Sequence, residues 1–278
     1  MTREATLDRN GIRSQFRELA ELLDEAVTVY LIGGGALTLR NLKNATKDVD
    51  LIVENTEELE RLRRSLRNAG FQPPENLQKE YEELDAAFIL EKGIRRFDVF
   101  RRQVAGELVL SEPMKERSQH LFDEGLLTVR MVSANDIFLF KSVANRDDDV
   151  DDMVVLVQAG IDEAIIMDEA RRQIGEIGQD AFVRSMKQKM TRLKADGYSF
   201  DIHDDVSTLY TELEKAETVE QTVWNLYDTE YRDDLYDGVP RSRLERQLPE
   251  EVDVDEALEW LRRVDRLQTA PDGSLVPL

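Results

Sequence analysis

Apolar and β-branched residues concentrate near the start of the chain in two short runs. The first run, Val27–Ile32, has the length and composition of a strand and is followed directly by three glycines. Good helix formers occupy Ala36–Asn44, and a second β-branched run follows at Val49–Val53. The pattern therefore predicts a strand, a sharp glycine turn, a short helix and a second strand.

Helical and strand-like patterns continue on both sides of this unit. Ser133 is a good N-cap residue for a helix that starts at Ala134. Helices are expected at Asp8–Ala26, Glu57–Ala69, Ala134–Ala144 and Asp151–Ala159, and strands at Ala86–Glu91, Ile94–Arg101, Leu108–Leu110 and Leu126–Val132.

The pattern changes after Gly160, where strand-like and glycine-rich segments give way to helical spacing of apolar residues. Pro271–Leu278 reads as a tail. Helices are expected at Glu163–Ile174, Gln179–Asp196, Val206–Glu217, Val219–Tyr227 and Val254–Leu267. We therefore expect an α/β protein with two domains, an α/β domain over residues 1–160 and a helical domain over residues 161–278.

Candidate chemistry lies between the two first strands. Gly33, Gly34 and Gly35 let the backbone turn sharply and leave the start of the next helix uncovered by side chains, which suits a polyphosphate. Asp48 and Asp50 are two residues apart, so in a strand their side chains lie on the same face, with their backbone positions roughly 7 Å apart. Two carboxylates aimed at one place repel each other unless a cation lies between them, and their oxygens suit Mg²⁺ or Mn²⁺.

Two other nucleotide-binding motifs are excluded by single positions. A dinucleotide-binding Gly-x-Gly-x-x-Gly pattern needs glycine where the chain has Thr38, and the Gly-Lys-Ser/Thr of a phosphate loop is absent. Taken alone, a glycine turn or an Asp-x-Asp pair is common in acidic proteins. The order and spacing of the two together are what point to a site.

This combination resembles the signature of the DNA polymerase beta-type nucleotidyltransferase superfamily, carried here by Ile32–Gly35 and Asp48–Leu51. The motif Gly-Gly-Gly-Ala-Leu, together with Thr46 before the aspartate pair, is most similar to small prokaryotic members, including nucleotidyltransferase-like toxins of toxin–antitoxin systems. The chain departs from this signature at Gly35, because many members of the superfamily have a serine next to the glycine of the turn. The resemblance implies a small mixed sheet with flanking helices, and transfer of a nucleotidyl group from a nucleoside triphosphate to an acceptor hydroxyl.

The resemblance also implies roles for individual residues. Asp98, in a predicted strand, would be the third carboxylate of a metal site with Asp48 and Asp50. The three glycines would hold phosphates. Lys141, on a helix followed by an acidic run that includes Asp149 and Asp152, would bind the triphosphate. Structural alternatives stay open at this point: Asp98 could be a surface residue paired with a nearby arginine, Lys141 could extend to solvent, and the acidic run could be a solvated helix start.

Charge and composition indicate the kind of organism and the cellular compartment in which the protein is expected. The formal net charge is −21, and the 37 basic residues are 27 arginines and 10 lysines. A lysine-poor acidic surface favours solubility in multimolar salt, which suggests a halophilic, haloarchaeal source. The chain has no cysteine, which excludes disulfides and thiolate metal sites. With no apolar run of membrane-spanning length and no signal-peptide core, we expect a cytoplasmic protein that does not enter a membrane.

The acceptor is the least constrained part of this hypothesis. Arg95, Arg96, Arg101 and Arg102 cluster around Asp98, and such an arginine-lined cleft suits an RNA end. The helical domain offers a surface for a protein partner. A rival interpretation is a non-catalytic nucleotide-sensing or antitoxin-like module that binds another protein. A third is an unrelated acidic α/β protein whose aspartates are surface residues.

Overall fold

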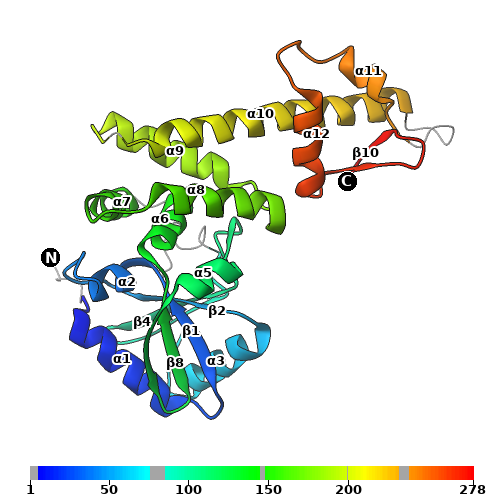
Figure 1. The fold of residues 1–278 in the computed structure, drawn as a ribbon. Coiled ribbons are helices and arrows are strands. Elements are labelled where there is room, and N and C mark those ends of the chain that lie inside the picture. The colour runs from blue at the N-terminus through cyan, green and yellow to red at the C-terminus, as the bar shows by residue number, and fades with distance from the viewer. Residues whose placement is uncertain (1–5, 76–84, 145–147, 199, 232–237) are drawn as a thin grey trace. The chain divides into compact units, whose positions relative to one another are not determined.

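A computed structural model describes residues 6–75, 85–144, 148–198, 200–231 and 238–278 of the chain (Figure 1). The protein has the predicted mixed α/β fold, with a helical C-terminal region. It divides into two compact units, which are described separately. The first unit contains residues 1–166 with 192–198, and the second contains residues 167–191 with 199–278.

The first unit is built on a six-stranded mixed sheet with the order β3-β4-β2-β1-β8-β7. The pairs β2–β4 and β1–β8 are parallel, and the remaining neighbours are antiparallel. The strands are β1 (Val27–Leu31), β2 (Val49–Val53), β3 (Phe88–Lys92), β4 (Arg95–Arg101), β7 (Gln119–Glu124) and β8 (Leu127–Met131). A separate two-stranded ladder joins β5 (Gln103–Val104) to β6 (Leu108–Val109).

Helices surround this sheet, and four of them begin at side chains that cap the helix, including Ser111 at the start of α5. Asp8, Asn55 and Ser133 each accept a hydrogen bond from a backbone N–H in the first turn, which satisfies a donor that has no partner within the helix. The helices are α1 (Arg9–Leu22), α2 (Gly33–Leu39), α3 (Thr56–Asn68), α5 (Glu112–Arg117), α6 (Ala134–Val143) and α7 (Asp148–Gln158).

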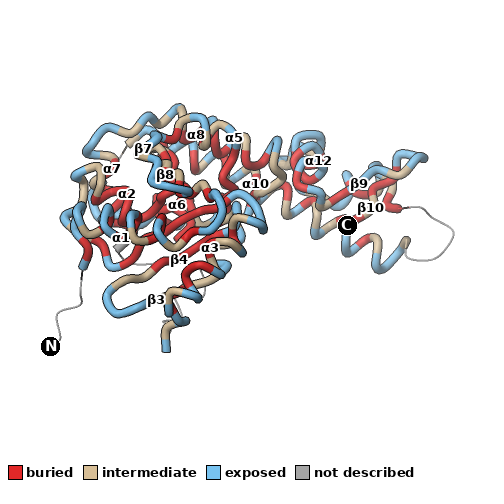
Figure 2. Tube along the Cα trace, turned by 90° about the horizontal axis from the view of Figure 1, so that it is seen from below, coloured by how far each residue is buried: buried red, intermediate tan, exposed pale blue. Residues whose placement is uncertain are grey.

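The core of the first unit lies along the central strands. Every residue of β2 is buried, and Figure 2 shows buried segments running through β4, β8, α2 and α6. Val99 and Phe100 of β4 are buried beside Leu51 and Ile52 of β2. Each such side chain contributes roughly 1.5–3 kcal/mol when fully buried. The carboxylates on β2 and β4 are therefore attached to the most firmly packed part of the unit.

Two local expectations for the first unit need correction. Helix α2 starts at Gly33 rather than at Ala36, so the glycines form its first turn, and it ends at Leu39 rather than Asn44. Asn41 has φ of 63°, a left-handed conformation that ends a helix. In addition, the charged stretch 111–119 lies outside the expected helices and strands, whereas it contains α5 and leads into β7, an edge strand with little apolar pattern.

The second unit is mainly helical. It contains most of α8 (Glu163–Arg172) and α9 (Phe182–Ala195), together with α10 (Ile202–Leu226), α11 (Arg241–Glu245) and α12 (Val254–Arg263). Helix α10 packs against α12 and against the strand β10 (Leu275–Pro277). Short π-helical turns follow α8 and α10.

Three expectations for this unit were wrong. The segments 206–217 and 219–227 are not two helices, because α10 runs without a break through Thr218, whose hydroxyl bonds back to the carbonyl of Glu214. The predicted helix at 254–267 ends at Arg263. The C-terminal residues are not a tail, because β10 pairs with β9 (Leu267–Thr269) in an antiparallel ladder. These strands are too short for a period-two pattern to show in the sequence.

Among the described residues, no helix combines the length and the apolar character that crossing a membrane requires.

Candidate active site

Two carboxylates enter the site from the start of β2. Asp50 lies within the strand and Asp48 immediately precedes it, so the two side chains share one face as the alternation predicts. The segment before Asp48 is fixed by a two-way backbone pairing between Leu7 and Thr46, at 2.7 and 2.9 Å. The Thr46 hydroxyl lies 3.4 Å from Oδ1 of Asp48. The position of Asp48 is thus fixed by the Leu7–Thr46 pairing that precedes it and by the pairing of β2 that follows it.

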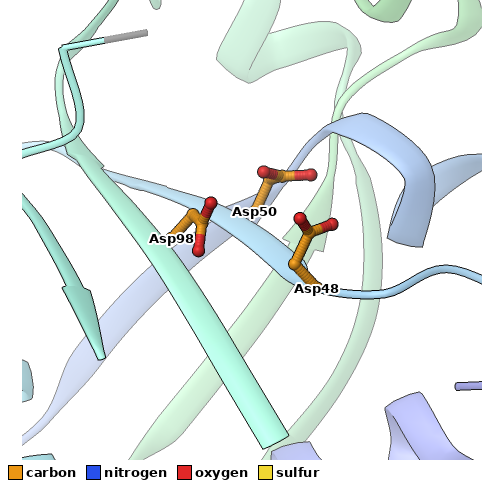
Figure 3. A group of neighbouring side chains, drawn as sticks. All are labelled: Asp48, Asp50 and Asp98. Carbon is orange, nitrogen blue, oxygen red and sulfur yellow. The ribbon is translucent and has the colours of Figure 1, made fainter. Parts of the chain in front are cut away.

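The third carboxylate comes from the neighbouring strand. Because β2 and β4 are parallel, Asp98 lies directly opposite Asp50 in the register. Figure 3 shows the three side chains converging from β2 and β4, and one oxygen of each lies within 4.8 Å of the others. All three residues are buried, and Asp98 is 0 % exposed. This grouping was predicted for Asp48, Asp50 and Asp98, and it excludes the alternative that Asp98 is a surface residue.

Asp98 has an internal counter-ion on its own strand. The Arg96 guanidinium donates from Nε to Oδ1 at 2.7 Å and from Nη2 to Oδ2 at 2.9 Å. Such a bidentate pair holds a carboxylate in one orientation. Three carboxylates with this guanidinium carry a formal charge of −2. A divalent cation matches that charge, and the carboxylate oxygens are the ligands that such cations prefer.

The glycines allow the chain to pass very close to the acidic group. Gly33 has φ of +61°, and a Cβ built on it would lie 2.1 Å from Oδ2 of Asp50. A Cβ on Gly34 would lie 2.6 Å from the Thr46 hydroxyl oxygen, while one on Gly35 would lie 3.1 Å from Cδ1 of Leu31. Only glycine fits at position 33, where both the backbone conformation and the contact with Asp50 require it.

Lys141 belongs to a buried ionic cluster at the end of α6. Its ammonium lies 2.6 Å from Oδ1 of Asp149 and 2.8 Å from Oδ2 of Asp152, both on α7. The Lys141 side chain is only 5 % exposed, so it does not extend to solvent. Asp152 also accepts from Lys43, at 2.9 and 3.1 Å. One carboxylate therefore links two lysines that are far apart in the sequence.

Asp48 and Asp50 border the same hollow as this cluster, and the hollow has a volume of about 140 Å³. Lys43 is 34 % exposed, which makes it the more accessible of the two lysines. The residues that line the hollow and that bear on the argument are Gly34, Lys43, Asp48, Asp50, Lys141 and Asp152. Positive and negative groups thus meet in a cavity of the size that a few phosphate oxygens or hydrated ions fill.

The structure also adds a residue that sequence reasoning missed. Lys43 lies in the polar stretch between α2 and β2, in no motif, and only its position beside α7 connects it to the site. Asp149 and Asp152 were singled out within the acidic run, and they are the members that contact Lys141. The interpretation of that run as solvated charge is wrong for these two, because both are buried.

The arginines around Asp98 do not form the cleft that was expected. Arg96 is bound to Asp98, and Arg95 is paired with Glu18 of α1. Arg101 donates to the hydroxyl of Thr56 at 3.3 Å. In this conformation the guanidinium groups of Arg95 and Arg96 are both engaged with carboxylates of the protein, which opposes a role in binding RNA phosphates.

A strand, a glycine-started helix and two neighbouring strands that bring three carboxylates together are the features of a nucleotidyltransferase. The family model described as "Nucleotidyltransferase of unknown function (DUF6036)" matches residues 11–157, which is more than half of the 278-residue chain. The chain belongs to this family. Its matched part includes both strands that carry the aspartates, the glycines and the α6–α7 cluster. No curated protein matches the chain significantly.

Proposed function

We propose that the protein transfers a nucleotidyl group from a nucleoside triphosphate to an acceptor hydroxyl, with Asp48, Asp50 and Asp98 as the metal-binding and catalytic residues. The observation that carries the proposal is the convergence of these three buried carboxylates within 4.8 Å. Buried carboxylates repel one another and lose hydration, so a protein that keeps three together needs a compensating cation.

The donor set fits Mg²⁺ or Mn²⁺, because it consists of hard oxygen ligands with a compensating guanidinium. Bound there, such a metal would polarise the phosphate and lower the pKa of the acceptor hydroxyl. Asp48 and Asp50 would orient the triphosphate, and Asp98, fixed by Arg96, would face the acceptor hydroxyl.

Phosphates of the nucleotide would occupy the hollow beside these carboxylates. Gly33, Gly34 and Gly35 leave the backbone open to a close approach, and Gly34 itself lines the hollow. Lys43 and Lys141 supply ammonium groups at its border. Lys141 is held by two carboxylates, so we assign the first contact with phosphate to the more accessible Lys43 and the later neutralisation of the leaving pyrophosphate to Lys141.

The sequence motifs also support a narrower assignment of the protein within the superfamily. We place the protein in the toxin-like prokaryotic branch of the DNA polymerase beta-type superfamily, in a halophilic host. Supporting this are the Gly-Gly-Gly-Ala-Leu wording, Thr46 before the carboxylates and a lysine paired with the acidic residues that follow it. Residues 1–160 would carry the activity on an RNA end, and residues 161–278 would contact a protein partner.

The test is label transfer by the full-length protein. It would be incubated in molar salt with each labelled nucleoside triphosphate, Mg²⁺ or Mn²⁺, and cellular RNA. Transfer to RNA is expected, and it should fall roughly 100-fold or more in Asp50→Asn and Asp98→Asn. Asp123→Asn is the matched control, since Asp123 is exposed on β7 and bonds only to local partners.

The contrary outcomes are separable. Label on protein with RNA untouched at every salt concentration would change the acceptor to a protein side chain. Absence of both transfer and metal-dependent triphosphate binding would refute the proposed reaction. Triphosphate binding without transfer to any acceptor would instead favour the nucleotide-sensing module.

A further inference from the structure

Two further hollows lie on the first unit, besides the one at the candidate active site. The first, of about 260 Å³, is lined by Asp8, Arg9, Asn10, Arg13 and Asn44. Asn44 lies between Lys43 and Ala45, which line the active-site hollow, so the two depressions share one stretch of chain. The second, of about 330 Å³, shares Arg13 with the first. The three hollows are therefore lined by neighbouring residues and form a series, from Asp48 and Asp50 through Asn44 to Arg13.

The lining of the two further hollows has more arginines than carboxylates, although the chain is strongly acidic. Arg9 and Arg13 are one turn apart on α1 and exposed, and Arg40 follows α2 and is half-buried. Within the described part of the chain, none of these three arginines has a carboxylate within 4.0 Å. Asp8, the acidic residue of the first hollow, accepts from the backbone N–H of Gly11 as the cap of α1. Arg40 has only a more distant acidic neighbour, Asp136, which is itself ion-paired with Arg117. A −21 chain that leaves exposed arginines such as Arg9 and Arg13 without a carboxylate in ion-pair distance among its described residues presents a surface for an external anion.

The contacts of the arginines leave donors for such an anion. Arg40 donates from Nη2 to the carbonyl of Val132, and Arg9 donates to the amide oxygen of Asn41. Burial lowers the pKa of the Arg40 guanidinium, since water that would stabilise its charge is excluded. A phosphate beside Arg40 would restore that stabilisation, and the flat guanidinium group matches phosphate geometry.

The rest of the lining of the second hollow is not basic. Leu121 and Phe122 of β7 line it together with Met131 of β8, and the exposed Gln119 adds an amide. A hollow that combines apolar and aromatic residues with arginines suits a nucleotide, whose base stacks or packs while its phosphate meets the cations. An acidic protein segment would use the arginines but leave the apolar residues without a matching group.

We infer that the series of hollows from Lys43 through Arg9 and Arg13 to Arg40 and Phe122 is the binding surface for single-stranded RNA whose end reaches the carboxylates. This inference rests on the proposed nucleotidyl transfer and gives its acceptor a location. It replaces the arginines around Asp98, which are engaged within the protein. Phosphates contact Arg9, Arg13 and Arg40, and one base occupies the hollow beside Phe122.

The experiment measures binding of a short fluorescein-labelled single-stranded RNA to the full-length protein, over a range of salt in which the protein remains folded. Arg13→Gln should bind roughly tenfold more weakly than the wild type. For the double variant Arg9→Gln/Arg13→Gln, the slope of log affinity against log salt should fall by about 1.4, because each lost phosphate contact removes about 0.7. Arg67→Gln is the matched control, since Arg67 is exposed on α3 and lines neither hollow.

Each outcome has one meaning. Equal RNA affinity of Arg13→Gln and Arg67→Gln would overturn the inference, as would binding of poly-glutamate in place of RNA. Metal-dependent triphosphate binding, measured on the same samples, separates this inference from the proposed function. If the wild type binds triphosphate and transfers label while the arginine variants bind RNA normally, only the docking surface is wrong. If the wild type binds neither triphosphate nor RNA, both are wrong.

Discussion

The Arg96 guanidinium grips Asp98 through two hydrogen bonds while the same carboxylate faces Asp48 and Asp50. Arg96 is 19 % exposed and Asp98 is 1 % exposed, measured on their side chains, so the pair is largely removed from water. In the metal-free protein Arg96 offsets part of the repulsion among the three carboxylates. Arg96 therefore stabilises the metal-free site, and it also competes with a metal ion for the carboxylate of Asp98.

Replacement of Arg96 should make folding depend on metal. Arg96→Gln leaves a buried carboxylate without its counter-ion, which should lower the free energy of unfolding of the metal-free protein by about 3 kcal/mol. Added Mn²⁺ should recover more stability in this variant than in the wild type. Arg95→Gln is the control, because the neighbouring Arg95–Glu18 pair is more exposed and contributes at most about 1 kcal/mol. Chemical denaturation with and without Mn²⁺ gives both values, and equal gains from Mn²⁺ in wild type and Arg96→Gln would contradict this account.

Addition of one methyl group at Gly33 should disrupt the metal site. In Gly33→Ala the new Cβ meets Oδ2 of Asp50, so that carboxylate must move, and Mn²⁺ binding should weaken at least tenfold. Gly93→Ala provides the control for backbone strain, because Gly93 has φ of +63° but nothing within 4 Å of an added Cβ. Both variants should lose about 1 kcal/mol of stability from the left-handed conformation, and only Gly33→Ala should lose Mn²⁺ in calorimetric titration. Normal Mn²⁺ binding by Gly33→Ala would mean that Asp50 is not a ligand.

Substitutions of the two lysines bound to Asp152 should have different effects on triphosphate binding and on stability. Lys43→Gln should weaken triphosphate binding roughly tenfold with little change in stability, because Lys43 is partly exposed and borders the hollow. Lys141→Met should also destabilise the protein by about 3–5 kcal/mol, since it removes the ammonium that is paired with the buried Asp149. Lys115→Gln, which removes a lysine paired with Glu112 outside the hollow, serves as the control. Triphosphate titrations and urea unfolding of the three variants provide the comparison, and normal triphosphate binding by Lys43→Gln would exclude Lys43 from the site.

Salt should stabilise the protein instead of weakening it. The formal charge of −21 and the small number of lysines predict that the free energy of unfolding rises from low to multimolar KCl. Thermal unfolding midpoints across this range measure the effect. Screening alone would reduce the contribution of the exposed ion pairs, so a flat or falling curve would argue against adaptation to high salt.

Most of the acidic site could be predicted because local patterns determine it. Val49–Val53 is a strand in the structure with the predicted bounds, and the period of two places Asp48 and Asp50 on one face. The position of Asp98 followed from a strand pattern and a family resemblance, and parallel pairing then brings it opposite Asp50. Lys141 was identified in the same way, as a lysine on an apolar helix.

What escaped prediction depends on contacts between distant parts of the chain. Lys43 and Asp152 are 109 residues apart, and nothing near either residue indicates the other. The bond from Arg96 to Asp98 is local, yet a sequence cannot distinguish a guanidinium that holds a carboxylate from one that faces solvent. The C-terminal ladder of β9 and β10 likewise depends on pairing rather than on composition, and its β10 residue Leu275 also bridges to Val239.

The parallel pairing of β2 with β4 makes the acidic site sensitive to strand alignment and indifferent to most changes of loop length. Insertions or deletions in the connection between α3 and β3 would leave β2, β4 and the register that places Asp98 opposite Asp50 unchanged. A slip of a single residue between the two strands, by contrast, would turn Asp98 to the opposite face of the sheet and end its contact with the other two aspartates. Homologues with very different connections could therefore share the site, and a bound Mn²⁺ ion would report that β2 and β4 had paired in the correct alignment.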